Sequence, residues 1–142
     1  MVYLHSEITG EILNAFYDVY NELGYGFLER VYKNALYKEL KKRGFDCSTE
    51  RSIPVYYQGE LVGDYYADII IEDKIIIELK AIKQILPEHE AQLMNYLRAT
   101  DAEVGLLLNF GPTPQKRRIV FTNDRKKNHM NTLILENNTT EK

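Results

Sequence analysis

Apolar residues recur at helical spacing along the first third of the chain. Between residues 4 and 23 they lie three or four positions apart, which predicts an amphipathic helix ending at Gly24, a residue that tolerates positive φ. A second run over residues 27–43 ends in Lys41-Lys42-Arg43-Gly44, where cations in the last turn and a following glycine favour a helix end. The pattern therefore predicts that two helices open the domain.

From residue 45 onwards the spacing of apolar residues becomes that of β-strands. Residues 53–57 are strand-like, and Gln58-Gly59 is a turn signal. The runs at residues 65–71 and 75–80 are apolar on both faces, which predicts two strands in the middle of a covered sheet. A short polar segment, Glu72-Asp73-Lys74, joins these two strands.

The remaining sequence predicts one more helix and two more strands. Pro87 suits a first helical position and opens a helix that runs to about residue 100. Residues 103–109 are typical of a buried strand, and residues 117–122 predict a last strand after a loop rich in glycine and proline. The order α-α-β-β-β-α-β-β places the chain in the α/β class, as a mixed β-sheet flanked by helices on both faces.

The bulk composition suits one soluble domain. With 142 residues, 44% of them hydrophobic and 27% charged, we expect a single domain over residues 1–135 and a flexible polar tail over residues 136–142. No apolar run approaches the roughly 18 residues of a membrane helix, and residues 1–7 lack the features of a secretory signal. Cys47 is the single cysteine, which excludes an internal disulfide. We therefore expect a cytoplasmic protein with no membrane partner.

Three charged residues interrupt the two central strands. Asp68 lies in Ala-Asp-Ile-Ile-Ile, and Glu78 and Lys80 lie in Ile-Ile-Ile-Glu-Leu-Lys, where alternation puts both on one face of the strand. A carboxylate in a covered sheet is unfavourable unless it is paired or binds a metal. If Asp68 and Glu78 are neighbours, a divalent cation removes their repulsion, and oxygen ligands of this kind suit Mg²⁺ or Mn²⁺.

The loop between these strands decides whether the two carboxylates meet. A two-residue turn would put Asp68 and Glu78 on opposite faces of the sheet. A three-residue loop over Glu72-Asp73-Lys74 would pair Ile71 with Ile75, and therefore Asp68 with Glu78. We predict the second register, or a bulge with the same effect.

Other interpretations of these charges remain open. Asp68 or Glu78 could form a buried salt bridge with Lys80, or the strand ends could simply be exposed. On the following helix, Gln92 and Tyr96 are four residues apart and share a face, although a solvated helix face is the more common explanation of such a pair.

The net charge of −3 conceals an uneven distribution of charged residues. Residues 1–115 carry 11 Lys and Arg against 18 Asp and Glu, whereas residues 116–142 carry 7 against 3. Six of these last seven cations form two clusters that could bind the phosphate groups of a nucleic acid: Lys116, Arg117, Arg118, Arg125, Lys126 and Lys127. A solvated strand end and loop would produce the same clusters.

The heptapeptide Gly26-Phe-Leu-Glu29-Arg-Val-Tyr32 resembles the signature of the GxxExxY family, a bacterial and archaeal group within the PD-(D/E)XK nuclease superfamily. The resemblance covers nearly the whole chain, from the opening helix through Asn109-Phe-Gly to the strand at Arg118-Ile-Val. Three further features fit the pattern of the superfamily: Asp68, Glu78-Leu-Lys80 and Gln92-x-x-x-Tyr96.

This resemblance implies a restriction-endonuclease-like fold and a metal site. Asp68 and Glu78 would be the principal metal ligands, aided by the backbone carbonyl of Leu79. Glu29, on the helix before the sheet, would contribute to the site directly or through water. The implied cofactor is Mg²⁺ or Mn²⁺.

The resemblance also implies an activity, namely metal-dependent hydrolysis of phosphodiester bonds with DNA as the expected substrate. Lys80 would orient or help deprotonate the attacking water and stabilise the charge on the phosphate. Gln92 and Tyr96 resemble the helix motif of RecB-like nucleases, which supports the active site close to DNA.

Two other functions remain open at the level of the sequence. The chain could be a non-catalytic nucleic-acid-binding or regulatory module that retains the nuclease fold, or its acidic site could serve another phosphate-containing substrate. Fold alone does not choose between such functions. A domain of this size has little surface for gripping a duplex, so we expect a homodimer or a partner protein.

Overall fold

The two predicted N-terminal helices are present and end where the glycines lie. In the computed structural model, which describes residues 4–126, α1 spans Ser6–Leu23 and α2 spans Glu29–Lys42. Gly24 follows α1 with φ 71°, and Gly44 lies just after α2 with φ 95°. Positive φ is readily available to glycine, so both helices stop at these positions.

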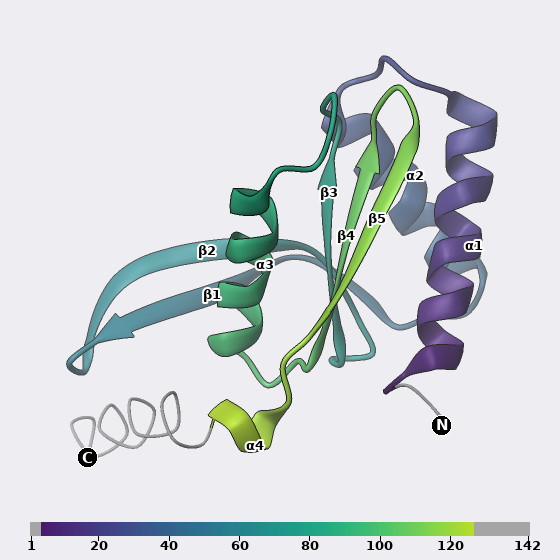
Figure 1. Cartoon of the computed structure of the whole chain (residues 1–142). Helices are drawn as coiled ribbons and strands as arrows, with labels where there is room; N and C mark the ends of the chain where they lie inside the picture. Colours follow the sequence, from purple (N-terminus) through teal and green to yellow (C-terminus); the bar gives the residue numbers. More distant parts are fainter. Residues whose placement is uncertain (1–3, 127–142) are drawn as a thin grey trace.

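Five strands form one mixed sheet in the order β1-β2-β3-β4-β5 (Figure 1). The strands are β1 (Cys47–Tyr57), β2 (Glu60–Ile71), β3 (Ile75–Lys80), β4 (Val104–Phe110) and β5 (Pro114–Val120). Strands β3 and β4 are parallel and are connected through α3 (Pro87–Arg98), while the other neighbouring strands pair antiparallel. The predicted element order and mixed sheet are confirmed. A four-residue helix, α4 (Asn123–Lys126), follows β5 and was not predicted.

The helices cover both faces of the sheet. Phe16 of α1 and Leu36 of α2 pack with Ile77 on one face, whereas Leu93 of α3 packs with Ile76 on the other. Figure 1 shows α1 and α2 on one side of the central strands and α3 on the opposite side. Because both faces are covered, β3 is buried from its first residue to Leu79 and β4 along its whole length, as the unbroken apolar runs indicated.

The strands β1 and β2 continue beyond the sheet as a two-stranded arm, which we define as residues 51–67 (Figure 1). β2 pairs with β3 over residues 69–71, whereas its pairing with β1 extends to Glu60. The predicted turn at Gln58-Gly59 closes the arm, with φ of 49° and 80° at its two residues. The arm therefore separates from β3 at Asp68.

The register between β2 and β3 is the predicted one. Ile71 pairs with Ile75, and the N–H of Lys74 donates to the carbonyl oxygen of Ile71 at 2.9 Å. Glu72 and Asp73 in the loop both have positive φ, of 55° and 56°. This register brings Asp68 level with Glu78 at the point where the two strands separate. The predicted tail at residues 136–142 lies outside the described residues, so the boundary at residue 135 stays a prediction.

A buried asparagine holds the loop that follows β3. The side chain of Asn109, in β4, accepts a hydrogen bond from the N–H of Ile82 at 3.0 Å and donates to its carbonyl oxygen at 3.0 Å. It also donates to Oε1 of Gln115 at 3.2 Å, and the same oxygen accepts the N–H of Ile85 at 3.0 Å. A Cβ at Gly111 would lie 2.3 Å from the carbonyl oxygen of Ile82, so this end of β4 closes tightly on the loop.

Replacing Asn109 by Ala should lower the free energy of unfolding by about 1–3 kcal/mol, because the N–H and C=O of Ile82 lose their side-chain partner. Chemical denaturation measures the change. Asn14→Ala, at an exposed position of α1, is the matched control and should stay within about 0.5 kcal/mol of the wild type. Equal stability of the Asn109 variant and the control would contradict this role.

Candidate active site

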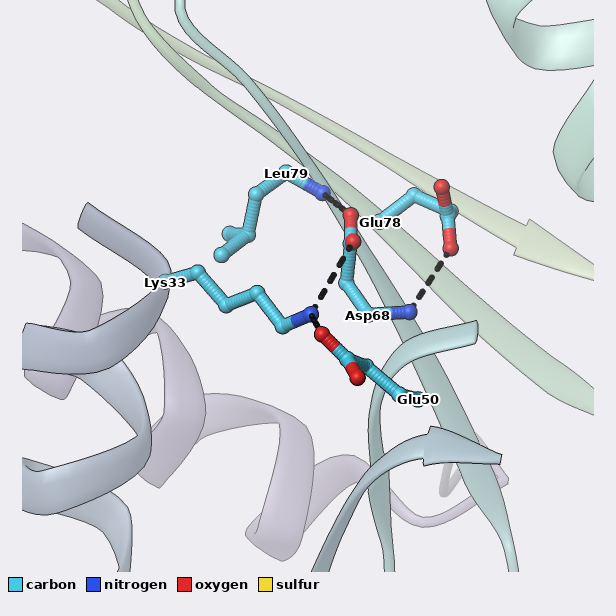
Figure 2. A network of polar contacts seen from close by, with 5 residues as sticks. All are labelled: Lys33, Glu50, Asp68, Glu78 and Leu79. Carbon is cyan, nitrogen blue, oxygen red and sulfur yellow. Dashed lines mark hydrogen bonds and ion pairs between the residues drawn. The ribbon is translucent and has the colours of Figure 1, made fainter. Parts of the chain in front are cut away.

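The backbone pairing between β2 and β3 ends in two hydrogen bonds made by carboxylates. The N–H of Asp68 donates to Oε1 of Glu78 at 3.1 Å, and the N–H of Leu79 donates to Oδ2 of Asp68 at 2.9 Å. The carboxylates thus replace backbone carbonyls where the strands separate (Figure 2). Because buried N–H groups need acceptors, the fold itself holds both carboxylates at this gap.

An irregularity in the sheet directs the Asp68 side chain. Ala67 and Ile70 pack in the core beneath α3, whereas Ile69 packs in the core beneath α1 and α2, so the regular alternation of side chains breaks at Asp68. Glu50, the residue of β1 at the same level, has φ 53°. Irregularities of this kind bend a strand and redirect a side chain. The position of Asp68 was predicted from the sequence, whereas this change of direction was not.

The carboxyl group of Glu78 is buried, with 6% of the residue exposed. Burial, followed by the negative charge of Asp68, raises its pKa to about 8, against the lowering effects of the Asp68 N–H and of Lys80. No described Lys or Arg forms an ion pair with Glu78. A buried carboxyl group beside a second carboxylate is therefore left without a cation.

This donor set fits a divalent cation. Asp68 and Glu78 offer carboxylate oxygens, which Mg²⁺ and Mn²⁺ prefer. The N–H of Leu79 points into the gap, and in an extended strand the carbonyl of the same residue faces the same edge, so it is available there as well. Within residues 4–126, no three His, Cys, Asp or Glu side chains lie close enough to share one ion.

Glu29 lies at the first residue of α2, within electrostatic range of the site. Partial burial and the charge of Asp68 raise its pKa, while Lys80 and Lys33 lower it. The first turn of a helix also favours a carboxylate. The structure thus places Glu29, Asp68, Glu78 and Lys80 in one electrostatic cluster.

The buried Tyr32 fixes the loop that precedes Glu29. Its hydroxyl donates to the carbonyl oxygen of Gly24 at 2.6 Å and accepts the N–H of Phe27 at 3.1 Å. Its ring stacks on Phe110 with 4.3 Å between the ring centroids. The hydroxyl role was not identified from the sequence, where Tyr32 appears as the last residue of the heptapeptide. It gives a physical reason for a tyrosine three residues after Glu29.

Two further charged residues of the site were not identified from the sequence. Lys33 places its Nζ 3.1 Å from Oε1 of Glu50 and 3.9 Å from Oδ1 of Asp68 (Figure 2). Lys33 follows Glu29 by four residues, a spacing that puts both on one side of α2 and could have indicated it. Glu50 gave no such signal, because its place depends on the irregularity in β1.

Of the remaining predicted catalytic residues, Lys80 and Tyr96 lie within electrostatic range of the same gap. Lys80, at the end of β3, forms no ion pair with Asp68 or Glu78 among the described contacts, so the alternative of a buried salt bridge is not observed. Tyr96 of α3 is buried, and burial together with the charges of Glu78 and Asp68 raises its pKa to about 12. Gln92 lies one turn earlier on α3 and is half-buried.

The cations predicted to bind phosphate on β5 are exposed at one edge of the sheet. Lys116 lies over the ring of Tyr17, 5.7 Å from its centroid, and Arg117 lies 3.9 Å from a carboxylate oxygen of Glu90. Arg118 donates to the backbone carbonyl of the N-terminal segment at Leu4. This edge is two strands away from β3.

In the second predicted cluster of cations, Arg125 and Lys126 have different environments. Arg125 is exposed and lies over the ring of Phe121, 4.7 Å from its centroid. Lys126 is buried, and its Nζ donates to the carbonyl oxygens of Thr100 at 2.9 Å and Ala102 at 2.6 Å. Burial lowers its pKa. The prediction that Lys126 binds phosphate is therefore wrong, because its ammonium group is buried and donates to backbone carbonyls of the protein. Lys127 lies outside the described residues.

Comparisons with known proteins agree with this architecture. Residues 6–120 match the family model of the PD-(D/E)XK nuclease superfamily. The crystal structure of SSO0001 is similar, with a TM-score of 0.51 and 24% sequence identity over 79% of this chain and 58% of that chain, which shows a shared fold. This chain thus spans less than two thirds of that protein. No curated protein matches the sequence. None of the helices in residues 4–126 is long and apolar enough to cross a membrane.

The raised pKa of Glu78 should make the metal-free protein less stable as pH rises. Between the ordinary carboxyl pKa of 4.5 and about 8, the unfolded chain releases a proton that the folded protein retains, so stability falls with pH across this window. Glu78→Gln keeps an acceptor for the Asp68 N–H and should lose this dependence. Thermal unfolding is measured in chelator from about pH 5 to pH 8. Over this range the free energy of unfolding of the variant, relative to that of the wild type, should rise by about 1.4 kcal/mol for each unit of pKa shift that the substitution removes.

Glu11→Gln, at an exposed position of α1, is the control and should follow the wild type at every pH. Parallel curves for wild type and Glu78→Gln would contradict the raised pKa.

Proposed function

Because this chain belongs to the PD-(D/E)XK nuclease superfamily, we propose that it is a divalent-metal-dependent nuclease that hydrolyses phosphodiester bonds in DNA. The observation that supports this most strongly is the buried Glu78 beside Asp68, with Lys80 two residues further along β3. Two neighbouring carboxyl groups repel each other in a covered sheet, and Lys33, 3.9 Å from Asp68, forms no ion pair with Glu78, so a metal ion between them would remove that repulsion. The closer assignment to the GxxExxY family rests on the heptapeptide that contains Glu29 and Tyr32.

Asp68, Glu78 and the carbonyl of Leu79 would hold Mg²⁺ or Mn²⁺. When bound, such an ion lowers the pKa of a coordinated water and offsets charge on the phosphate. Glu29 would orient water at the edge of the site from the start of α2. The hydrogen bonds from the backbone to Asp68 and Glu78 fix both carboxylates before any substrate arrives, which reduces the reorganisation needed for the reaction.

Lys80 would orient the attacking water and donate hydrogen bonds to the charged phosphate oxygens. It follows Glu78 by two residues in β3, so both side chains project toward the same face of that strand. Tyr96 keeps its proton near neutral pH, because its pKa is raised to about 12, and its hydroxyl can therefore donate a hydrogen bond beside the carboxylates. Gln92 would support the same region from the preceding turn of α3.

The exposed cations at Lys116, Arg117, Arg118 and Arg125 would contact phosphates farther along the nucleic acid. Such contacts position a strand without reading its sequence. A homodimer or a partner protein would supply the additional surface that a domain of this size lacks.

Lys80 distinguishes a nuclease from a non-catalytic binding module better than the carboxylates do. Asp68 and Glu78 each accept a backbone N–H, so the sheet needs them even without catalysis. Within residues 4–126, Lys80 forms no hydrogen bond or ion pair, and its charge acts on Glu29 and Glu78 only through space, so it has no comparable structural role. Its presence beside two carboxylates is accounted for by chemistry on a phosphate.

Asp68→Asn and Lys80→Ala should each reduce cleavage at least about a hundredfold, because each removes a charged group from the reacting centre. Asparagine keeps an acceptor for the Leu79 N–H, so the fold should survive. The measurement is cleavage of branched, single-stranded and duplex DNA with Mg²⁺ or Mn²⁺ by the purified full chain.

Lys83→Ala, at an exposed position just after β3, is the matched control and should retain activity. Cleavage by Lys80→Ala at the wild-type rate, or no cleavage of any substrate by the wild type, would favour the non-catalytic binding module instead.

A further inference from the structure

A pocket of about 330 Å³ opens beside Asp68. Of its five lining residues, only Asp68 belongs to the proposed metal site. Its walls are Lys33, Glu50, Tyr66, Ala67 and Asp68. The side chains of Lys33 and Asp68 are 16% and 18% exposed, whereas that of Glu50 is 73% exposed at the rim. The pocket thus adjoins the reacting centre and combines one cation and one aromatic residue with two carboxylates, those of Glu50 and Asp68.

Tyr66 lines this pocket, and its hydroxyl has a hydrogen-bond partner within β2. Its hydroxyl donates to Oδ2 of Asp64 at 3.2 Å, and Oδ1 of Asp64 accepts a hydrogen bond from Ser52. No described aromatic ring lies against Tyr66, whereas the neighbouring Tyr65 contacts the ring of Tyr96 at 5.7 Å. Tyr66 remains 57% exposed. The hydroxyl is therefore held while the ring is free to contact a ligand.

Lys33 can exchange its partner at small energetic expense. Its partner Glu50 is mostly in solvent, so the carboxylate can be rehydrated when it leaves, while Asp68 stays 3.9 Å from the Lys33 ammonium. A phosphate oxygen offers the ammonium a stronger, charge-assisted hydrogen bond. Figure 2 shows Lys33 between Glu50 and Asp68, so a phosphate that replaced Glu50 would lie next to the proposed metal ligand.

We propose that this pocket binds a nucleotide with an unpaired base next to the scissile phosphate, with Tyr66 stacking on the base and Lys33 binding a phosphate. The inference rests on the proposed nuclease function and names its substrate class, which is single-stranded or locally unpaired nucleic acid. Bases in a duplex are already stacked and paired, so they present no free face to Tyr66, whereas each base of a single strand does.

Two other features agree with this substrate class. Residues 1–115, which hold the pocket, carry 18 acidic against 11 basic side chains, a balance unsuited to gripping a duplex through many phosphates. The segment that leads into Glu29 exposes Tyr25, Phe27 and Leu28 by 60%, 50% and 71%. These residues offer unpaired bases a second apolar surface close to the start of α2.

A tryptophan probe tests the stacking directly, because the chain contains no tryptophan. In Tyr66→Trp, a single-stranded oligonucleotide should quench the fluorescence, and a duplex of the same sequence should not. Ca²⁺ replaces Mg²⁺ to keep the DNA intact. Tyr57→Trp, at the far end of the arm and 63% exposed in the wild type, is the matched control and should not respond. Equal quenching by both DNA forms, or equal quenching in both variants, would overturn the proposal.

Binding affinity provides a second test with the full chain. By fluorescence anisotropy, Tyr66→Ala should bind the single strand about 5- to 100-fold more weakly than wild type, with duplex binding unchanged. Tyr66→Phe should bind as wild type does, since it keeps the ring. Lys33→Met should lower the slope of log affinity against log salt concentration by the amount expected for about one phosphate contact. Wild-type affinity of Tyr66→Ala for the single strand would refute the stacking role.

The outcome for the pocket can be separated from the outcome for the nuclease. Cleavage that depends on Asp68 but not on Tyr66 would leave the proposed function standing and remove the nucleotide pocket. Binding of single strands that depends on Tyr66, without cleavage in Mg²⁺ or Mn²⁺, would support the pocket as part of a non-catalytic module.

Discussion

The structure depends on how two partly buried backbone N–H groups are satisfied where β2 leaves β3. A sheet that separates in mid-strand exposes donors that would normally bond to the neighbouring strand, and leaving them unpaired in the interior is unfavourable. Here the carboxylates of Asp68 and Glu78 accept these N–H groups. The arm can therefore separate from the sheet, and the acids are held at the gap. The pocket beside Asp68 exists because the strands separate at this place.

Much of this arrangement follows from the sequence, since hydrophobic periodicity and loop length are local properties. A three-residue loop at Glu72-Asp73-Lys74, preferred over a two-residue turn, predicted the register that brings Asp68 level with Glu78. The interior position of β4 followed from its apolar run. Contacts between distant segments were not predictable in this way. Lys33 meets Glu50 through an irregularity in β1, and Lys126 folds back onto carbonyls about 25 residues earlier.

The double role of Asp68 and Glu78 changes what their presence means. From the sequence, charged residues in apolar strands indicate chemistry, because the core gives no other reason for them. The structure supplies such a reason, since both side chains complete the backbone hydrogen bonding of the sheet. Lys80 lacks this second role. In this chain Asp68 and Glu78 by themselves indicate only how the site is built. The ammonium group of Lys80 beside them is the feature that favours catalysis.

The amide protons of Asp68 and Leu79 have an unusual property as a result. Each points to a carboxylate oxygen rather than to a neutral carbonyl, so its hydrogen bond strengthens or weakens with the charge on that oxygen. Protonation, or capture of an ion, changes that charge directly. In an isotope-labelled sample, the chemical shifts of two backbone resonances would therefore follow the state of the site without any substrate or optical label.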